Sequence, residues 1–190
     1  MSTISLFDPV LPEGFSYYPE FLSAEDEQRL LEIVQDLDLQ PMVFQGYQAK
    51  RKTKSFGYDY HFHSRKLEKG LPIPETFNAL IDKVSLKLAF DPKLFKEVLV
   101  TEYPPGSVIN WHRDAPPFGL ISGISLLSDC SLRFRPHDKS KQGRKTIINI
   151  TIQRCSLYIL DGISRSDWEH SILPVNKTRY SITLRTLGKF

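Results

Sequence analysis

Apolar residues recur at helical spacing in two stretches of the first half of the chain. Leu30, Ile33, Val34 and Leu37 repeat every three or four residues after Ser23, a residue type that often caps a helix. A second helix is predicted at about 75–90, with an apolar stripe made of Phe77, Leu80, Ile81, Val84 and Leu88. Both helices are expected to pack against the rest of the protein.

From residue 96 onward, the pattern changes to short apolar or alternating runs separated by turn residues. Strands are predicted at 97–103, 107–114, 120–127, 131–136, 145–152, 155–160 and 178–187. Many short strands after two helices are typical of an α+β fold, in which an antiparallel sandwich carries helices on one side.

Length and composition add general limits. The 190 residues, with 41% hydrophobic and 25% charged residues, suit one globular domain. No apolar run is long enough to span a membrane, and residues 1–10 lack a secretory signal pattern, so a cytoplasmic protein is predicted. The protein is also expected to be a monomer. Cys130 and Cys155 show no metal-binding spacing and are predicted to be buried free thiols.

Basic residues gather in two stretches, although the net charge is only +3. Residues 50–66 and 133–145 each carry six Lys or Arg against one acidic residue. In the wider segment 42–66 aromatic residues lie among the cations, and such a mixture can bind nucleic acid by stacking and phosphate contacts. The alternative is an outer hairpin with aromatics toward the core, so Phe56, Tyr58 and Tyr60 are only candidate substrate contacts.

A possible metal site begins at His112-x-Asp114, because side chains two apart on a strand point to the same face. His170 offers a third ligand, and two His with one carboxylate suit a non-haem Fe(II) site. His-x-Asp alone arises often by chance, and each residue could instead be an ordinary surface or turn residue. His61, His63 and His137 lack such partners and are predicted to be surface histidines.

The last predicted strand alternates strictly. Its polar face carries Arg179, Ser181, Thr183 and Arg185. If that face points inward, the arginines require an anion, which a dicarboxylate would supply.

Together these motifs resemble the AlkB family of Fe(II)/2-oxoglutarate dioxygenases. The resemblance runs from about Leu11 to Leu187 and includes Tyr103-Pro104-Pro105-Gly106, His112-x-Asp114, Gly162-x-x-Arg165-x-x-Trp168-x-His170 and the two arginines with Ser181 and Thr183 between them. It implies a double-stranded β-helix, or jelly roll, at 96–190. Residues 1–95 would supply flanking helices and a substrate lid at about 42–66, within one domain of 1–190.

The resemblance also implies roles for individual residues. His112, Asp114 and His170 would hold iron, Arg185 the C1 carboxylate of 2-oxoglutarate, and Arg179 with Tyr103 its C5 carboxylate. Thr101 and Ser181 stand where many relatives have Asn, and Asn110 is expected to line the pocket from the same strand face as His112.

The activity implied is oxidative dealkylation of bases such as 1-methyladenine or 3-methylcytosine in DNA or RNA, with 2-oxoglutarate and O2 consumed. The base would have to be flipped or single-stranded. Arg113 and Arg165 are further candidate substrate contacts, although Arg165 could instead pair with a neighbour, and Ala115-Pro116-Pro117 lacks the acid that repair members often carry after the His-x-Asp motif. The alternatives are the same chemistry on a protein or other substrate, and a nucleic-acid-binding jelly roll without catalysis.

Overall fold

The computed structural model describes residues 10–44, 47–61 and 64–188. Residues 1–9, where the sequence predicts no secretory signal, lie outside the described residues, as do His63 and parts of the expected lid at 45–46 and 62–63. Within the described ranges, no helix is long and apolar enough to cross a membrane.

Helix α1 (Ala24–Gln35) begins as the sequence predicts. Ser23 accepts a hydrogen bond from the Asp26 backbone, and the Asp26 carboxylate accepts one from the Ser23 backbone, which completes a capping box. Leu30, Leu31 and Val34 on its inner face are buried. The cap therefore sets where the helix starts, and the apolar stripe sets which face packs.

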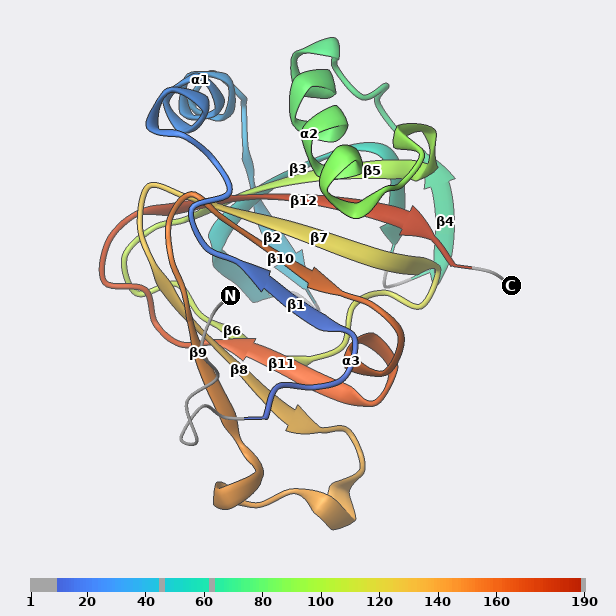
Figure 1. Ribbon diagram of the computed structural model, residues 1–190, viewed down its shortest axis with the longest axis vertical. Coiled ribbons are helices and arrows are strands. Elements are labelled where there is room, and N and C mark those ends of the chain that lie inside the picture. The colour runs from blue at the N-terminus through green and yellow to red at the C-terminus, as the bar shows by residue number, and fades with distance from the viewer. Residues whose placement is uncertain (1–9, 45–46, 62–63, 189–190) are drawn as a thin grey trace.

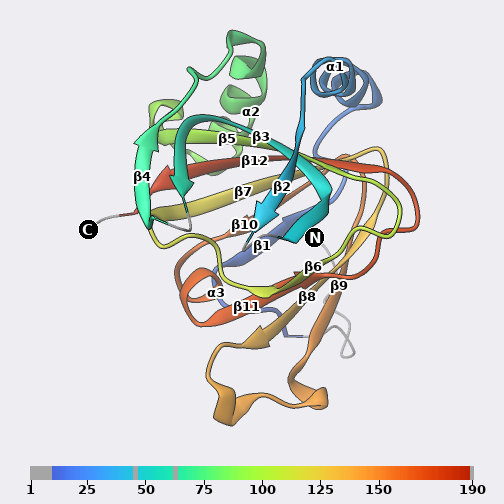
Figure 2. The same ribbon diagram turned by 180° about the vertical axis from the view of Figure 1, so that it is seen from behind.

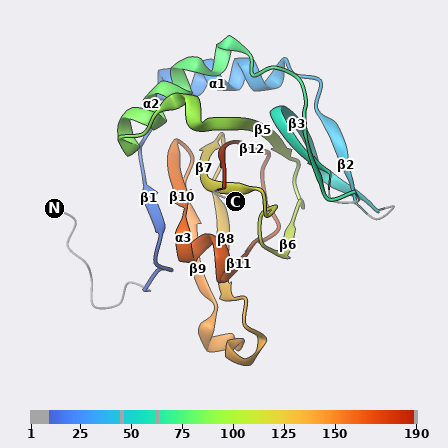
Figure 3. The ribbon, with the colours of Figure 1, turned by 90° about the vertical axis from the view of Figure 1, so that its right-hand side faces the viewer.

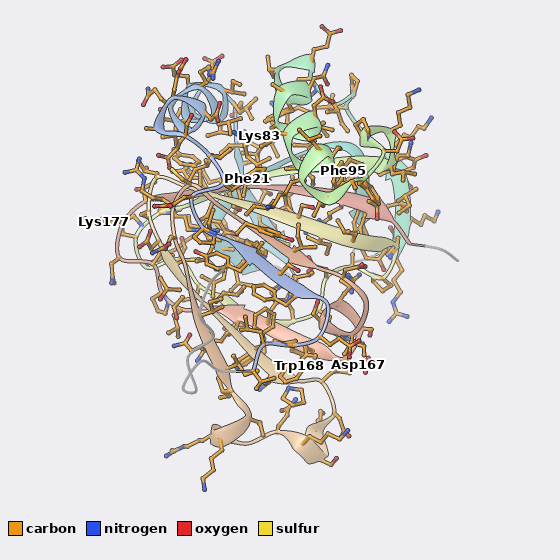
Figure 4. The ribbon with its side chains drawn as sticks, viewed as in Figure 1. Phe21, Lys83, Phe95, Asp167, Trp168 and Lys177 are labelled. Atoms are coloured by element: carbon orange, nitrogen blue, oxygen red, sulfur yellow. The ribbon has the colours of Figure 1, made fainter. Side chains whose placement is uncertain are left out.

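Helix α2 (Asn78–Leu88) follows a short 3-10 turn at Glu75–Phe77 and ends where Ala89 adopts a left-handed conformation. It lies beside α1, and Lys83 connects the two helices. Its ammonium group donates a 2.6 Å hydrogen bond to Asp26 and lies 5.6 Å from the centre of the Phe21 ring (Figure 4). The two helices thus form one layer.

Two antiparallel sheets make up the rest of the fold (Figure 1). The main sheet has the order β1-β10-β7-β12-β5-β3-β2, with β4 paired to β3. Its strands are β1 (Phe15–Tyr18), β2 (Gln40–Phe44), β3 (Tyr47–His61), β4 (Lys66–Lys69), β5 (Phe95–Tyr103), β7 (Phe118–Leu126), β10 (Ser156–Leu160) and β12 (Arg179–Leu187). The second sheet, of order β6-β11-β8-β9, consists of β6 (Ile109–His112), β11 (Trp168–Ile172), β8 (Cys130–Pro136) and β9 (Ile148–Ile152).

The layers follow from which faces are apolar. Both helices cover the outer face of the main sheet, and the second sheet faces its inner side (Figure 3). One apolar core fills the space between the helices and the main sheet, and a smaller one, with Phe134 and Ile152, lies between the sheets. In the view from behind, β2 lies at one edge of the main sheet next to β3, and β4 pairs with β3 (Figure 2). The expected jelly-roll architecture with flanking helices is confirmed.

The structure differs from the sequence prediction in four places. β6 ends at His112, so Asp114 lies beyond the strand instead of on it. β11 was not predicted, since its alternation is interrupted by polar residues. Residues 10–95 contribute the strands β1 to β4 to the sheets as well as the helices. The division into an N-terminal part, 1–95, and a jelly-roll core, 96–190, stays a prediction. Of the two free cysteines, Cys130 is buried as expected and Cys155 is only half-buried.

Candidate metal centre and its cavity

Three side chains from β6, the segment after it and β11 meet between the two sheets. His112, Asp114 and His170 each offer a ligand atom, and these atoms lie within 4.8 Å of one another. The pairing of β11 with β6 places two of these residues side by side, because His170 lies directly opposite His112. The nearest oxygen of Asp114 lies 3.5 Å from Nε2 of His170. The cluster expected from the sequence is therefore present.

His112 is oriented by its own strand. Its Nδ1 lies 2.9 Å from the backbone oxygen of Asn110, and because a carbonyl only accepts, Nδ1 is the donor. This leaves Nε2 with its lone pair free for a metal. The register shifts between Ile109 and His112, so these two residues share the inner face. The Asn110 side chain is exposed, and the prediction that it lines the pocket is wrong for this reason.

Protonation states favour metal binding. Burial, together with the neighbouring His112, lowers the pKa of His170 to about 4, so the imidazole is neutral at physiological pH. Burial alone would raise the pKa of Asp114, but Arg185 and the two histidines outweigh it and lower this pKa to about 2. Two imidazoles and one carboxylate are the donor set of a non-haem Fe(II) centre, so the residues fit the ion.

Arg185 joins this cluster to a second acid. Its terminal nitrogens donate to Asp114 at 3.0 Å and to Glu97 at 2.9 Å, while its Nε has no hydrogen-bond partner in the part of the chain that the structure describes. Glu97 also accepts a 2.9 Å hydrogen bond from Ser55. Burial raises the pKa of Glu97 despite the nearby Arg185. One guanidinium thus holds two buried carboxylates, and one of them belongs to the cluster.

Arg179 is buried without a full set of partners. Its Nε donates to Ser125 at 2.9 Å, and its guanidinium stacks on the Tyr103 ring at 4.8 Å. Both terminal nitrogens are buried and lack a hydrogen-bond partner among the described residues. An unpaired buried guanidinium is costly, so an anion is expected to satisfy it.

A cavity of about 970 Å³ opens above the cluster. The predicted site residues that line it are His112, Asp114, His170, Thr101, Tyr103, Arg185 and Tyr60. Segment 42–66 forms one wall with Arg51, Lys54 and Arg65, so cations lie along this side of the cavity. The lid role of the segment stays a prediction.

Other predicted residues do not line the cavity, namely Arg179, Ser181, Asn110, Phe56, Tyr58, Arg113 and Arg165. Phe56 is buried in the outer core against Phe77, so its assignment as a substrate contact is wrong. Arg165 donates to the backbone oxygens of Ala115 and Phe118, at 2.6 and 3.0 Å, instead of pairing with an acid. Arg113 is exposed and donates to the Ser166 backbone. These two arginines therefore hold loops in the structure.

Sequence reasoning missed four cavity residues with chemical potential: Glu97, Arg51, His61 and Tyr158. His61 was predicted to be an ordinary surface histidine, and it is exposed, but it also lines the cavity. The alternation of β5 gave a usable signal for Glu97, since Glu97, Leu99, Thr101 and Tyr103 share one face.

Comparisons with known proteins agree with this geometry. Residues 14–185 match the family described as the 2OG-Fe(II) oxygenase superfamily. A mouse protein named tRNA (carboxymethyluridine(34)-5-O)-methyltransferase ALKBH8 is 29% identical over 171 residues, 86% of this chain and 25% of that protein. The chain thus spans about a quarter of the length of this relative.

Two solved structures share the fold. The structure of OsALKBH1 superposes with a TM-score of 0.69 at 16% identity, covering 94% of this chain and 99% of the other. A Pseudomonas putida prolyl-4-hydroxylase gives a TM-score of 0.64 at 18% identity, covering 92% and 93%. At these identities the likeness concerns the fold alone.

Proposed function

This chain belongs to the 2OG-Fe(II) oxygenase superfamily, within which it is AlkB-like, and from this premise we propose that it oxidises alkyl groups on nucleobases in RNA or DNA. As a member of the superfamily it is a dioxygenase that uses Fe(II), 2-oxoglutarate and O2. Bound Fe(II), with 2-oxoglutarate and O2, would supply the oxidant for a substrate C–H bond, with succinate and CO2 as the co-products. On an N-methyl group the product loses formaldehyde.

One observation carries the proposal for the site. The two-histidine, one-carboxylate cluster lies in a cavity near Arg179, whose two buried terminal nitrogens have no hydrogen-bond partner among the described residues. We assign His112, Asp114 and His170 as the iron ligands, in keeping with the neutral His170 imidazole and the ionised Asp114 carboxylate. Arg179 would bind the distal carboxylate of 2-oxoglutarate. Arg185, which donates to Asp114 and whose Nε has no hydrogen-bond partner within the described ranges, would bind the end near the metal.

Charge supports a nucleic-acid substrate. Arg51, Lys54 and Arg65 line one side of the cavity, where a phosphate backbone could be held while one base enters. Tyr60 lines the same wall and is a candidate for stacking on that base. A cavity of about 970 Å³ has room for a flipped base together with the co-substrate.

The basic stretch at 133–145 forms a second cationic surface. It begins on β8, and its distal part lies in the connection between β8 and β9, which projects beyond the second sheet (Figure 1). Lys139, Lys141, Arg144 and Lys145 at its tip are exposed, against the single acid Asp138. The mouse relative is named for a reaction on tRNA, which favours RNA as the polymer.

The experiment uses protein reconstituted with Fe(II) without oxygen, then given 2-oxoglutarate, O2 and short oligonucleotides. RNA and DNA carrying 1-methyladenine or 3-methylcytosine, and bulk tRNA, are read by mass spectrometry, with succinate measured in parallel. Loss of a methyl group, or gain of one oxygen on a base, with matching succinate supports the proposal. His170→Ala is the matched inactive control.

The rival functions give different results. Succinate that depends on an added protein, with unchanged nucleic acid, would transfer the chemistry to a protein substrate. Oligonucleotide binding without succinate, in protein with iron demonstrably bound, would leave a binding module without catalysis. The donor cluster argues against the second outcome, because such a cluster serves no purpose in a module that only binds.

A further inference from the structure

The phenol of Tyr158 reaches over Gly123 on the inner face of the main sheet. The two residues pair directly in the β10–β7 ladder. A Cβ atom at residue 123 would lie 2.1 Å from Cζ of Tyr158 and 2.4 Å from its hydroxyl oxygen. Any side chain at residue 123 would therefore displace the ring, and the glycine is what gives the phenol its place.

The pairing of β7 with β12 gives the position of this hydroxyl relative to Arg179 and Arg185. Gly123 pairs with Thr183 on β12, and Thr183 lies between Arg179 and Arg185 along the strand. Thr183 lines the cavity, as Tyr158 does. The hydroxyl therefore lies over the part of the sheet that separates the two guanidinium groups. A dicarboxylate that contacts both arginines has to pass this part of the sheet.

The hydroxyl is free to serve a ligand. Within residues 10–44, 47–61 and 64–188, no protein group forms a hydrogen bond with it, and Tyr158 faces the cavity. Tyr17, its neighbour in the β1–β10 ladder, differs, because its hydroxyl accepts a hydrogen bond from the Gln153 backbone. Burial raises the pKa of the Tyr158 phenol, so the group stays protonated and can donate.

Arg179 adds a second, independent observation at this place. Its two terminal nitrogens are buried without a hydrogen-bond partner among the described residues, and its guanidinium stacks on the Tyr103 ring. Burial would lower the pKa of Arg179, but Cys130, Tyr103 and Tyr158 outweigh it and raise this pKa. A buried positive charge thus lies behind the cavity wall next to Tyr103, and both Tyr103 and Tyr158 line the cavity. This combination suits a carboxylate, which only accepts hydrogen bonds.

We propose that Tyr158 is a co-substrate contact whose hydroxyl donates a hydrogen bond to the distal carboxylate of 2-oxoglutarate, with Gly123 making room for it. The inference rests on the proposed function in one respect, that 2-oxoglutarate binds in this cavity.

The test compares two ligands on the Tyr158→Phe variant, which loses only the oxygen atom. Calorimetry with Mn(II)-loaded protein measures binding without turnover. Affinity for 2-oxoglutarate should fall about tenfold, the effect of one charge-assisted hydrogen bond. Affinity for 2-oxopentanoate, which has the same chain length but no distal carboxylate, should change by less than about twofold, because the lost donor has no partner in that ligand.

Tyr180→Phe is the matched control, since Tyr180 lies on β12 and packs into the outer core on the opposite face. It should leave both affinities unchanged. Gly123→Ala gives a second variant, which should weaken 2-oxoglutarate binding by displacing the phenol while 2-oxopentanoate still binds.

Each outcome is decisive. Equal loss of both ligands in Tyr158→Phe would overturn the inference, because the hydroxyl would then act on the fold or the metal end. Unchanged 2-oxoglutarate binding would overturn it and leave the proposed function standing. Wild-type protein that binds Mn(II) but no 2-oxoglutarate would remove the proposed function itself.

Discussion

Arg185 donates a 3.0 Å hydrogen bond to Asp114, the one carboxylate of the candidate metal centre. Its other terminal nitrogen donates to Glu97, whose side chain is only 3% exposed. The guanidinium thus fixes the orientation of a metal ligand and neutralises a second buried acid. A residue assigned to the co-substrate therefore also supports the metal centre, and its substitution should affect both.

Arg185→Met should lower metal affinity about 10- to 100-fold, since Asp114 loses the group that orients it. It should also cost about 3 kcal/mol or more of unfolding free energy, because Glu97 is left buried without its cationic partner. Metal titration and urea unfolding of the metal-free protein measure the two effects. Adding Glu97→Gln should recover much of the stability and none of the metal affinity. Full recovery of both would show that Arg185 does not position Asp114.

His170→Ala should abolish stoichiometric Fe(II) binding and turnover while the protein still folds, because His170 is one of only three clustered donors among the described residues. Anaerobic iron titration and circular dichroism measure these effects. The matched control is His137→Ala, which removes an exposed histidine 3.1 Å from Glu169 on the outer side of the second sheet. Iron binding that survives in His170→Ala would remove this residue from the metal site.

Arg179→Met should separate ligand binding from stability. Methionine removes two buried, unpaired nitrogens and keeps an apolar stem, so the metal-free protein should lose less than about 1 kcal/mol of unfolding free energy. The thermal stabilisation that 2-oxoglutarate gives the wild-type protein should disappear. Thermal unfolding with and without 2-oxoglutarate in the presence of Mn(II) measures it. Equal stabilisation of both proteins would place the co-substrate elsewhere.

Charge removal at the cavity wall should weaken nucleic-acid binding and its salt dependence. In Arg51→Gln/Lys54→Gln, the slope of log affinity against log salt should fall by about 1.4 for single-stranded RNA, at roughly 0.7 per phosphate contact. Fluorescence anisotropy at several salt concentrations gives the slope. Lys93→Gln, in the exposed turn after α2, is the control with no expected effect. An unchanged slope in the double variant would locate the polymer on another surface.

The hydrogen bond between Lys83 on α2 and Asp26 on α1 should make the stability of the protein depend on pH in the acid range. The hydrogen bond from Lys83, opposed only in part by burial, lowers the pKa of Asp26 from 3.8 to about 2. Because the folded pKa lies below the unfolded one, the stabilisation is complete above pH 4 and is lost as pH falls toward 2. Urea unfolding at pH 5 and pH 3 should show a smaller decrease for Asp26→Asn than for wild type. Equal decreases would assign the acid sensitivity to other carboxylates.

The sequence by itself determined both helices, most of the strands after residue 96, the candidate ligands and the family resemblance. Ser23 with Asp26 marked the start of α1 because capping is a local interaction. His112, Asp114 and His170 could be selected because few residue types bind iron. The strict alternation around Arg179 and Arg185 placed both on one face, which the β12 ladders bear out.

Only the tertiary structure decided which of these side chains meet a cavity. The shifted register in β6 turned Asn110 outward, and the pairing of β3 with β5 buried Phe56 in the outer core. Glu97 and Tyr158 became visible only when ladders joined strands distant in sequence, since the Tyr158 phenol depends on a glycine 35 residues earlier. Cross-strand neighbours and buried partners depend on long-range pairing, and local patterns in the chain do not contain it.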